Sequence, residues 1–353
     1  MRWQDHLRAV EPYVAGEQPK LKNLIKLNTN ENPYGPGEKV RAAIRDFDAD
    51  KLRLYPNADA EHLRHLLAVR HGLEDSQVFL GNGSDEVLAL TFLTCFNGEA
   101  PVLFPDITYS FYPVYCELFG IPYETKALAG DFAIIKEDYY GPNGGVIFPN
   151  PNAPTGLAMS LESIRDILGH NPDVVCVIDE AYVDFGGESA LGLLKDYDNL
   201  LIVKTFSKFR GLAGIRLGAA FGNPELVSHL YDVKNSFNSY PVDALAQVIG
   251  AASVEDSAAI EANAQKVINT RERVSSALKD MGFAMPESKS NFIFITHESV
   301  KAKDLFTGLR AQGIVVRYFD KPRIDNYLRV TIGTDEEMNR FLEVTGQLVK
   351  ELG

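Results

Sequence analysis

The sequence has little of what marks several common classes of protein. It has three cysteines in 353 residues, and Cys95, Cys116 and Cys176 stand among apolar neighbours without CxxC spacing. We therefore expect buried thiols in a reducing compartment, rather than disulfides or a metal site. No apolar run approaches the roughly 20 residues that a membrane helix needs. The N-terminal residues MRWQDHLRAV lack the apolar core of a secretory signal, so we expect a cytoplasmic protein.

Positive charge is also scarce. The chain has 35 lysines and arginines against 48 acidic residues, which gives a formal net charge of −13. Nucleic acids and anionic membrane surfaces are therefore poor partners, and we expect neither. If the ligands are small anions, a few placed arginines must overcome an unfavourable overall field.

The length and the spacing of apolar runs predict two units. A chain of 353 residues is too long for one compact core. We expect an N-terminal arm with part of a small unit at 1–54, a large unit at 55–240 and a C-terminal small unit at 241–353. The expected strands of the large unit are short apolar runs separated by amphipathic stretches: 78–80, 102–104, 146–148, 174–178, 200–203 and 217–221.

Several of these runs are apolar throughout, which is typical of strands covered by helices on both faces. The pattern predicts an α/β fold with a doubly wound, mostly parallel sheet, whose ligands bind at the carboxyl ends of the strands. After about residue 238 one long helical stretch, 243–281, is expected. The segments SNFIFIT, GIVVRYF and NYLRVTIGT follow it and predict a smaller α+β unit.

The strongest functional signal is Lys208, which directly follows the apolar run LLIV in the segment Thr205-Phe206-Ser207-Lys208. Charged side chains avoid the mouth of a buried strand unless they are paired or functional. Such a place favours the neutral amine that attacks carbonyl groups. Thr205 and Ser207 offer hydroxyl groups beside it, and Arg216 offers a planar fork suited to phosphate. Taken alone, Lys208 is equally compatible with a solvated loop lysine.

A second signal is Asp179, which ends the apolar run VVCVI and precedes Tyr182 by three residues. A buried aspartate should meet a cation, and the protonated nitrogen of a pyridine ring is such a cation. A helix N-cap and a magnesium ligand are the alternatives for this aspartate.

Two loops complete the set. In Phe148-Pro149-Asn150-Pro151-Asn152-Ala153-Pro154-Thr155-Gly156 the prolines fix an extended path, and we expect Asn152 to project its amide at the strand ends. In Gly81-Asn82-Gly83-Ser84-Asp85-Glu86 the glycines permit close backbone approach, and free amides at a helix start bind anions. The loop lacks the third glycine of GxGxxG and the Gly-Lys-Ser/Thr of a Walker loop, so nucleotide binding is poorly supported. Because Asp85 and Glu86 oppose a phosphate, we expect the contact to come from backbone amides and Ser84.

These four segments resemble the fold-type I pyridoxal-phosphate enzymes, the aspartate aminotransferase superfamily. The resemblance runs from about Leu27 to Gly333 and implies a large domain with a mostly parallel seven-stranded sheet beside a smaller α+β domain. It implies pyridoxal 5′-phosphate as cofactor, bound covalently by Lys208, with Asp179 on the pyridine nitrogen. The other cofactor contacts that it implies are Gly83, Ser84, Tyr109 (stacked on the ring), Asn152, Tyr182, Thr205, Ser207 and Arg216.

Within that superfamily the sequence is most similar to the histidinol-phosphate aminotransferase family. The similarity is carried by LNTNENPYGPG (27–37), RLYPNADAEHLR (53–64), GNGSDE (81–86) and NYLRVTIGT (326–334). It implies amino-group transfer between L-histidinol phosphate and 2-oxoglutarate, in histidine biosynthesis. It also implies a homodimer in which Tyr55 reaches the cofactor phosphate of the neighbouring active site. Ala153 departs from relatives that carry a second asparagine there.

The substrates pose a charge problem, because one site must accept both a phosphate and a carboxylate. Arg329 is the expected shared ligand and Arg317 the second, although a surface strand arginine is an equal alternative for Arg317. Asn30 and Tyr13 are further expected substrate contacts. We expect no metal, since His62 and His65 lack a carboxylate cluster. An aromatic amino-acid aminotransferase and a threonine-phosphate decarboxylase remain alternative functions, and a pyridoxal-phosphate-sensing regulator is disfavoured by the absence of a basic DNA-binding domain.

Overall fold

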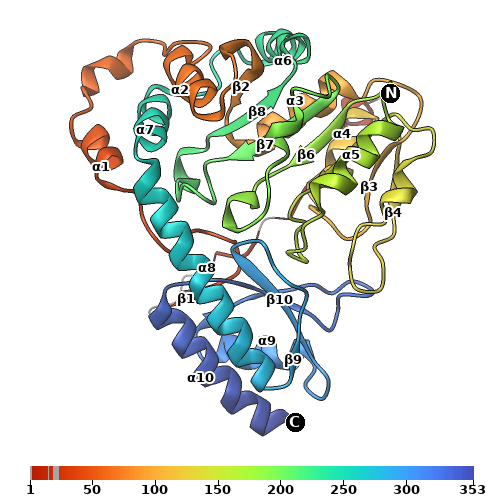
Figure 1. The fold of residues 1–353 in the computed structure, drawn as a ribbon, viewed down its shortest axis with the longest axis vertical. Helices are drawn as coiled ribbons and strands as arrows, with labels where there is room; N and C mark the ends of the chain where they lie inside the picture. The colour runs from red at the N-terminus through yellow and green to blue at the C-terminus, as the bar shows by residue number, and fades with distance from the viewer. Residues whose placement is uncertain (1, 15, 19–23) are drawn as a thin grey trace.

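A seven-stranded sheet forms the centre of the larger part of the molecule (Figure 1). The computed structural model describes residues 2–14, 16–18 and 24–353. The strand order is β2-β8-β7-β6-β5-β3-β4, and β8 alone runs antiparallel to its neighbours in this sheet. The expected mostly parallel sheet is therefore confirmed. The strands are β2 (Val78–Gly81), β3 (Val102–Pro105), β4 (Tyr123–Lys126), β5 (Gly145–Pro149), β6 (Cys176–Asp179), β7 (Leu200–Thr205) and β8 (Gly218–Gly222).

Helices cover both faces of this sheet, which explains why its strands are apolar throughout. Side chains alternate along a strand, so Val146 and Phe148 of β5 join one buried cluster while Ile147 joins the other. The first cluster includes side chains of α1 (Glu38–Arg45), α2 (Glu61–His71), α5 (Leu161–His170) and α7 (Ala244–Glu255). The second includes side chains of α3 (Gly83–Cys95), α4 (Phe111–Phe119) and α6 (Pro224–Phe237).

A smaller α+β unit lies below the large sheet and carries the C-terminus at its far end (Figure 1). Its antiparallel sheet has the order β12-β13-β10-β9, and β1 pairs in parallel with β11. Among the described residues, no helix is long and apolar enough to cross a membrane. The elements of this unit are β1 (Ile25–Lys26), α8 (Ser257–Asp280), β9 (Phe283–Ala284), β10 (Phe292–His297), α9 (Ala302–Ala311), β11 (Ile314–Val315), β12 (Arg317–Tyr318), β13 (Leu328–Thr331) and α10 (Asp335–Leu352).

The long helical stretch expected at 243–281 is two helices. It breaks at Asp256, between α7 and α8, where an aspartate and a serine are adjacent; both residues favour helix ends because they compete for backbone hydrogen bonds. Buried side chains of α7 belong to the core of the large sheet, whereas Val267 and Val274 of α8 belong to the core of the small unit. We therefore propose a division between the units at residue 256, with 38–54 assigned to the large unit through Val40.

Candidate active site

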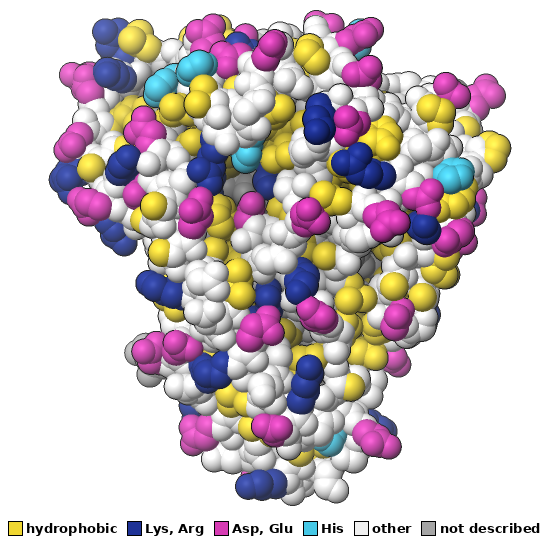
Figure 2. Space-filling view, in the orientation of Figure 1, with side chains coloured by type: hydrophobic (Ala, Val, Ile, Leu, Met, Phe, Trp, Pro, Cys, Tyr) yellow, Lys and Arg dark blue, Asp and Glu magenta, His cyan; other side chains and the backbone are white. Residues whose placement is uncertain are grey.

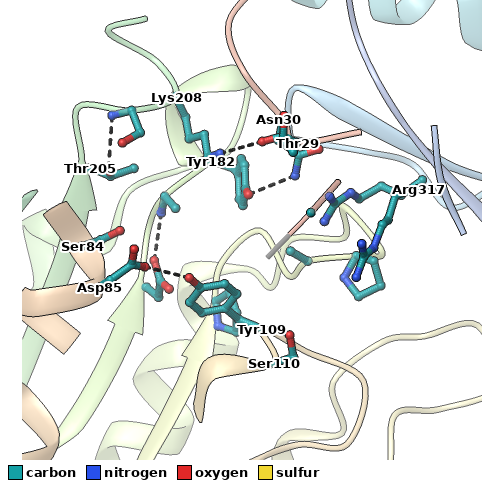
Figure 3. Close-up of a pocket in the computed structure, with 18 of the residues that line it drawn as sticks. Thr29, Asn30, Ser84, Asp85, Tyr109, Ser110, Tyr182, Thr205, Lys208 and Arg317 are labelled. Carbon is teal, nitrogen blue, oxygen red and sulfur yellow. Dashed lines mark hydrogen bonds between the residues drawn. The ribbon is translucent and has the colours of Figure 1, made fainter. Parts of the chain in front are cut away.

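A cavity of about 280 Å³ lies where the carboxyl ends of the central strands meet the small unit (Figure 3). Pro149, Asp179 and Thr205, the last residues of β5, β6 and β7, line it. The small unit contributes Arg317 and Arg329. The cavity also contains most of the residues predicted from the sequence: Tyr13, Asn30, Ser84, Tyr109, Tyr182, Ser207, Lys208 and Arg216.

Asp179 is a buried carboxylate without a cation. Its side chain accepts hydrogen bonds from the Tyr112 hydroxyl (3.1 Å) and from the Ala181 amide (3.2 Å). Among the described residues, no lysine, arginine or histidine forms an ion pair with it. Burial raises the pKa of Asp179 to about 6. A cationic group placed beside it would remove this cost, and the protonated nitrogen of a pyridine ring is such a group.

Lys208 lies across the cavity, where its amine meets backbone and aromatic groups (Figure 3). The Nζ atom donates to the carbonyl of Thr29 (3.0 Å) and lies 5.8 Å from the centre of the Tyr182 ring. The Tyr182 hydroxyl accepts a hydrogen bond from Asn30 (3.0 Å). Asn30 is itself buried at φ 56°, a left-handed conformation that asparagine tolerates. The amine therefore has no acid partner among the described residues and is free to react with a carbonyl group.

The N-terminus of α3 and Arg216 form one end of the cavity. Gly83 has φ 80°, and a Cβ atom there would lie 2.5 Å from Arg216 Nη2, so a side chain does not fit. Asp85 accepts hydrogen bonds from Arg216 (2.8 Å) and from the Tyr109 hydroxyl (2.8 Å). This contact is not evident from the sequence, because Arg216 lies 131 residues from Asp85. Arg216 and Ser84 can hold a phosphate against the backbone amides of the helix, while Asp85 positions Arg216.

Arg317 and Arg329 lie on adjacent strands at directly paired positions of β12 and β13. Neither makes an ion pair among the described residues. Arg329 donates to the carbonyl of Asn28 (2.9 Å), but its buried Nε has no acceptor, and burial lowers the pKa of its guanidinium. Tyr13 lines the same region with its ring stacked on Phe111 (4.2 Å between centres). Two uncompensated guanidinium groups suit an anionic ligand.

Asn152 and Tyr55, like Gly83, are predicted residues that do not line this cavity. The Asn152 amide donates to the carbonyl of Ile107 (2.9 Å) and is buried behind the wall, so Ala153 faces the cavity in its place. The Asn152 amide therefore makes hydrogen bonds within the protein, to Ile107 and Thr155, and the sequence motif did not indicate this. Tyr55 is 83% exposed and stacks on Tyr240 at the surface. It contributes nothing to the cavity of its own chain.

Comparison with known proteins gives the family. Residues 22–344 match the model of the family "Aminotransferase class I and II", and the chain therefore belongs to it. It is 54% identical to the histidinol-phosphate aminotransferase of Lactococcus lactis subsp. cremoris (strain SK11), over 99% of this chain and 98% of that one. The similarity to this group inferred from the sequence is thus confirmed.

Solved structures confirm the fold. The histidinol-phosphate aminotransferase from Clostridium acetobutylicum superposes with a TM-score of 0.86 at 23% identity, covering 93% of this chain and 100% of that chain. The histidinol-phosphate aminotransferase from Sinorhizobium meliloti, solved in complex with pyridoxal-5′-phosphate, gives a TM-score of 0.83 at 22% identity, covering 93% and 92%.

The burial of Asp179 predicts how the stability of the cofactor-free protein depends on pH. Because the folded-state pKa is raised to about 6 from 3.8, stability falls as the pH rises from 3.8 to about 6, and the full cost of the ionised carboxylate is present above pH 6. Asp179→Asn removes this cost. Denaturant unfolding at pH 8 should show the variant more stable than wild type by up to about 3 kcal/mol, and the difference should vanish near pH 4. Equal stabilities at pH 8 would contradict an uncompensated carboxylate.

Proposed function

We propose that this protein is a histidinol-phosphate aminotransferase. It would transfer the amino group of L-histidinol phosphate to 2-oxoglutarate, giving imidazole-acetol phosphate and L-glutamate, and so serve histidine biosynthesis. The observation that carries the proposal is that one cavity joins a lysine amine, a carboxylate without a cation and two arginines without acid partners in the part of the chain that the structure describes. The 54% identity to an enzyme of that name supports it.

The residues present fit pyridoxal 5′-phosphate as cofactor. Lys208 would bind its aldehyde carbon, and Asp179 would hold its pyridine nitrogen protonated. Arg216, Ser84 and Ser207 would hold the phosphate, with Thr205 beside them, since all four line the same cavity. Tyr109 would stack on the ring and Tyr182 would contact its phenolic oxygen. We propose that Asn152 does not contact the cofactor directly but stabilises the loop that places Ala153 in the cavity wall.

The cofactor, when bound, withdraws electrons from the substrate Cα and so makes its proton acidic. The incoming substrate amine would displace Lys208 from the cofactor, and the freed Nζ, the basic group at this end of the cavity, would act as general base on that proton and as general acid in returning it. Asp179 favours the charged pyridine nitrogen throughout, in a buried site where a fixed carboxylate acts strongly. Two substrates use the same groups in turn, which predicts ping-pong kinetics.

The paired arginines address the charge problem of the substrates. Arg329 and Arg317 lie on neighbouring strands and face the same cavity, so both guanidinium groups can meet one phosphate or one carboxylate. An aromatic amino-acid aminotransferase would need an arginine for the carboxylate but would bind its side chain in an apolar pocket. The arginine pair therefore favours a phosphate-bearing substrate.

Two measurements test this function. Specificity constants for histidinol phosphate and phenylalanine, determined side by side, should favour histidinol phosphate; a preference for phenylalanine would overturn the substrate assignment. Mixing the holoenzyme with glutamate alone should convert its spectrum to that of the pyridoxamine form. A threonine-phosphate decarboxylase should not make that conversion, so its absence would exclude transamination.

Lys208→Ala should abolish transamination and the visible absorbance of the lysine-bound cofactor. The fold should survive, because the Lys208 side chain lines the cavity and makes one hydrogen bond, from Nζ to the Thr29 carbonyl. Activity with glutamate and circular dichroism, measured on the same sample, check both statements. Turnover near that of the wild type would refute the assignment.

Arg329→Ala should lower the specificity constant for both substrates at least about tenfold, because a charge-assisted hydrogen bond contributes roughly 1.5–3 kcal/mol. Arg317→Ala should lower the specificity constant for histidinol phosphate more than that for glutamate, since a phosphate carries more charge and more acceptor oxygens than a carboxylate. Single-turnover rates for each substrate in each variant measure this. If Arg329→Ala impaired only the glutamate reaction, the two anions would use separate sites.

We further propose a cytoplasmic homodimer in which Tyr55 reaches the cofactor phosphate of the partner. Its exposure supports this arrangement, as does that of nearby apolar side chains, Leu52 and Leu54 (56% and 55%). Tyr55→Phe should then raise the cofactor dissociation constant several-fold without changing the sedimentation coefficient. A monomer with tightly bound cofactor would contradict the proposal. The exposed Tyr123→Phe, on β4, is a matched control that should leave cofactor binding unchanged.

A further inference from the structure

A second, smaller cavity of about 50 Å³ lies beside the candidate active site, between α2 and the ends of β7 and β8. Its walls include Arg70, His71, Lys204 and Arg210, with Asp184 as the one acidic side chain. The remaining walls are largely apolar. Figure 2 shows this face of the large unit hollowed just below the position of β7 in Figure 1, with basic, acidic and histidine side chains at the opening.

The basic side chains of this cavity differ in how their charge is balanced. Lys204 pairs with both Glu180 (3.3 Å) and Asp184 (3.2 Å). Arg70 pairs with Glu261 (2.7 Å). Each of these carboxylates therefore contacts a cation other than Arg210.

Arg210 is left without an anion. It is 8% exposed, and among the described residues it forms no ion pair. Its Nη1 donates to the backbone carbonyl (2.8 Å) and hydroxyl (3.2 Å) of Ser253, and its guanidinium lies 5.0 Å from the Phe206 ring centre. The other N–H groups have no acceptor among the described residues. Burial and the neighbouring Arg70 lower the pKa of Arg210 to about 10, although Asp184 and Glu261 partly offset this effect.

We propose that this cavity binds a small monovalent inorganic anion of chloride size, held by Arg210 with Arg70 and His71 beside it. A buried charge without a counter-ion is costly, and a water molecule would satisfy its hydrogen bonds but not its charge. The volume admits one small ion, since a cavity needs about 10–15 Å³ to hold one water molecule. His71 is neutral near pH 7, because burial lowers its pKa to about 4, and a neutral imidazole still offers one N–H donor. Asp184 opposes the anion, but its carboxylate is turned to Lys204.

The position of Arg210 connects this site to the active site. Arg210 follows Lys208 by two residues, and Gly211 donates its amide to the Lys208 carbonyl (3.2 Å). Thr205 lines both cavities. An anion on Arg210 therefore stabilises the turn that carries Lys208, and its effect should appear in the stability of the holoenzyme.

The test compares salts at equal ionic strength, so that general screening cancels. Thermal unfolding of the cofactor-saturated protein is followed in 200 mM sodium chloride and in 200 mM sodium gluconate, whose anion is too large for the cavity. Wild type should have a Tm about 2 °C higher in chloride. Arg210→Gln should lose this difference, whereas Arg340→Gln, on the exposed face of α10, should keep it.

Bromide replaces chloride in a second experiment that needs no variant. Crystals of the wild-type holoenzyme soaked in sodium bromide should show an anomalous peak within hydrogen-bond distance of the Arg210 guanidinium. Equal Tm values in the two salts together with no peak there would overturn the proposal. So would a chloride effect that Arg210→Gln retains, because the anion would then bind elsewhere, for example at Arg317 and Arg329.

Discussion

The parallel pairing of β6 with β7 determines where the chemistry of this molecule takes place. Asp179 pairs with Val203, and the pairing continues past the strand end, where the Glu180 amide donates to the Val203 carbonyl (2.7 Å). Because side chains alternate, Asp179 lines the main cavity while its neighbour Glu180 is held on Lys204, beside the second cavity. One register therefore positions the reactive carboxylate and buries the ion pair behind it.

Uncompensated charge is the feature that the sites share. Among the described residues, Asp179 is a buried anion without a cation, and Arg329 is a partly buried cation without an anion, whose buried Nε has no acceptor. Removing an unpaired charge from water costs free energy, so each of these groups favours a ligand of opposite charge. Asp179 lies at the strand ends of the large sheet and the two arginines lie on the small sheet, an arrangement that would suit a cationic cofactor nitrogen and an anionic substrate group.

The features that could be predicted from the sequence are those that depend on short segments of the chain. Runs of apolar residues predicted the buried strands. Lys208 and Asp179 could be predicted because each stands at the end of such a run. Strand β4 was missed because its residues YETK are largely exposed at the sheet edge and carry no apolar run. The contact of Asp85 with Arg216 and the inward turn of Asn152 depend on residues distant in the chain. Such contacts require the tertiary structure, which no local pattern encodes.

The division of the cavity between two units has a consequence for specificity. The groups that fit the cofactor, such as Asp179 and Arg216, come from the large sheet and its loops, whereas Arg317 and Arg329 come from the small sheet. Substitutions on β12 and β13 can therefore alter the anion that is accepted without disturbing cofactor retention. Because Arg317 and Arg329 are directly paired across two strands, a change at either one alters the surroundings of the other. Their effects on substrate preference should therefore be strongly non-additive, and a double-mutant cycle is the measurement that separates them.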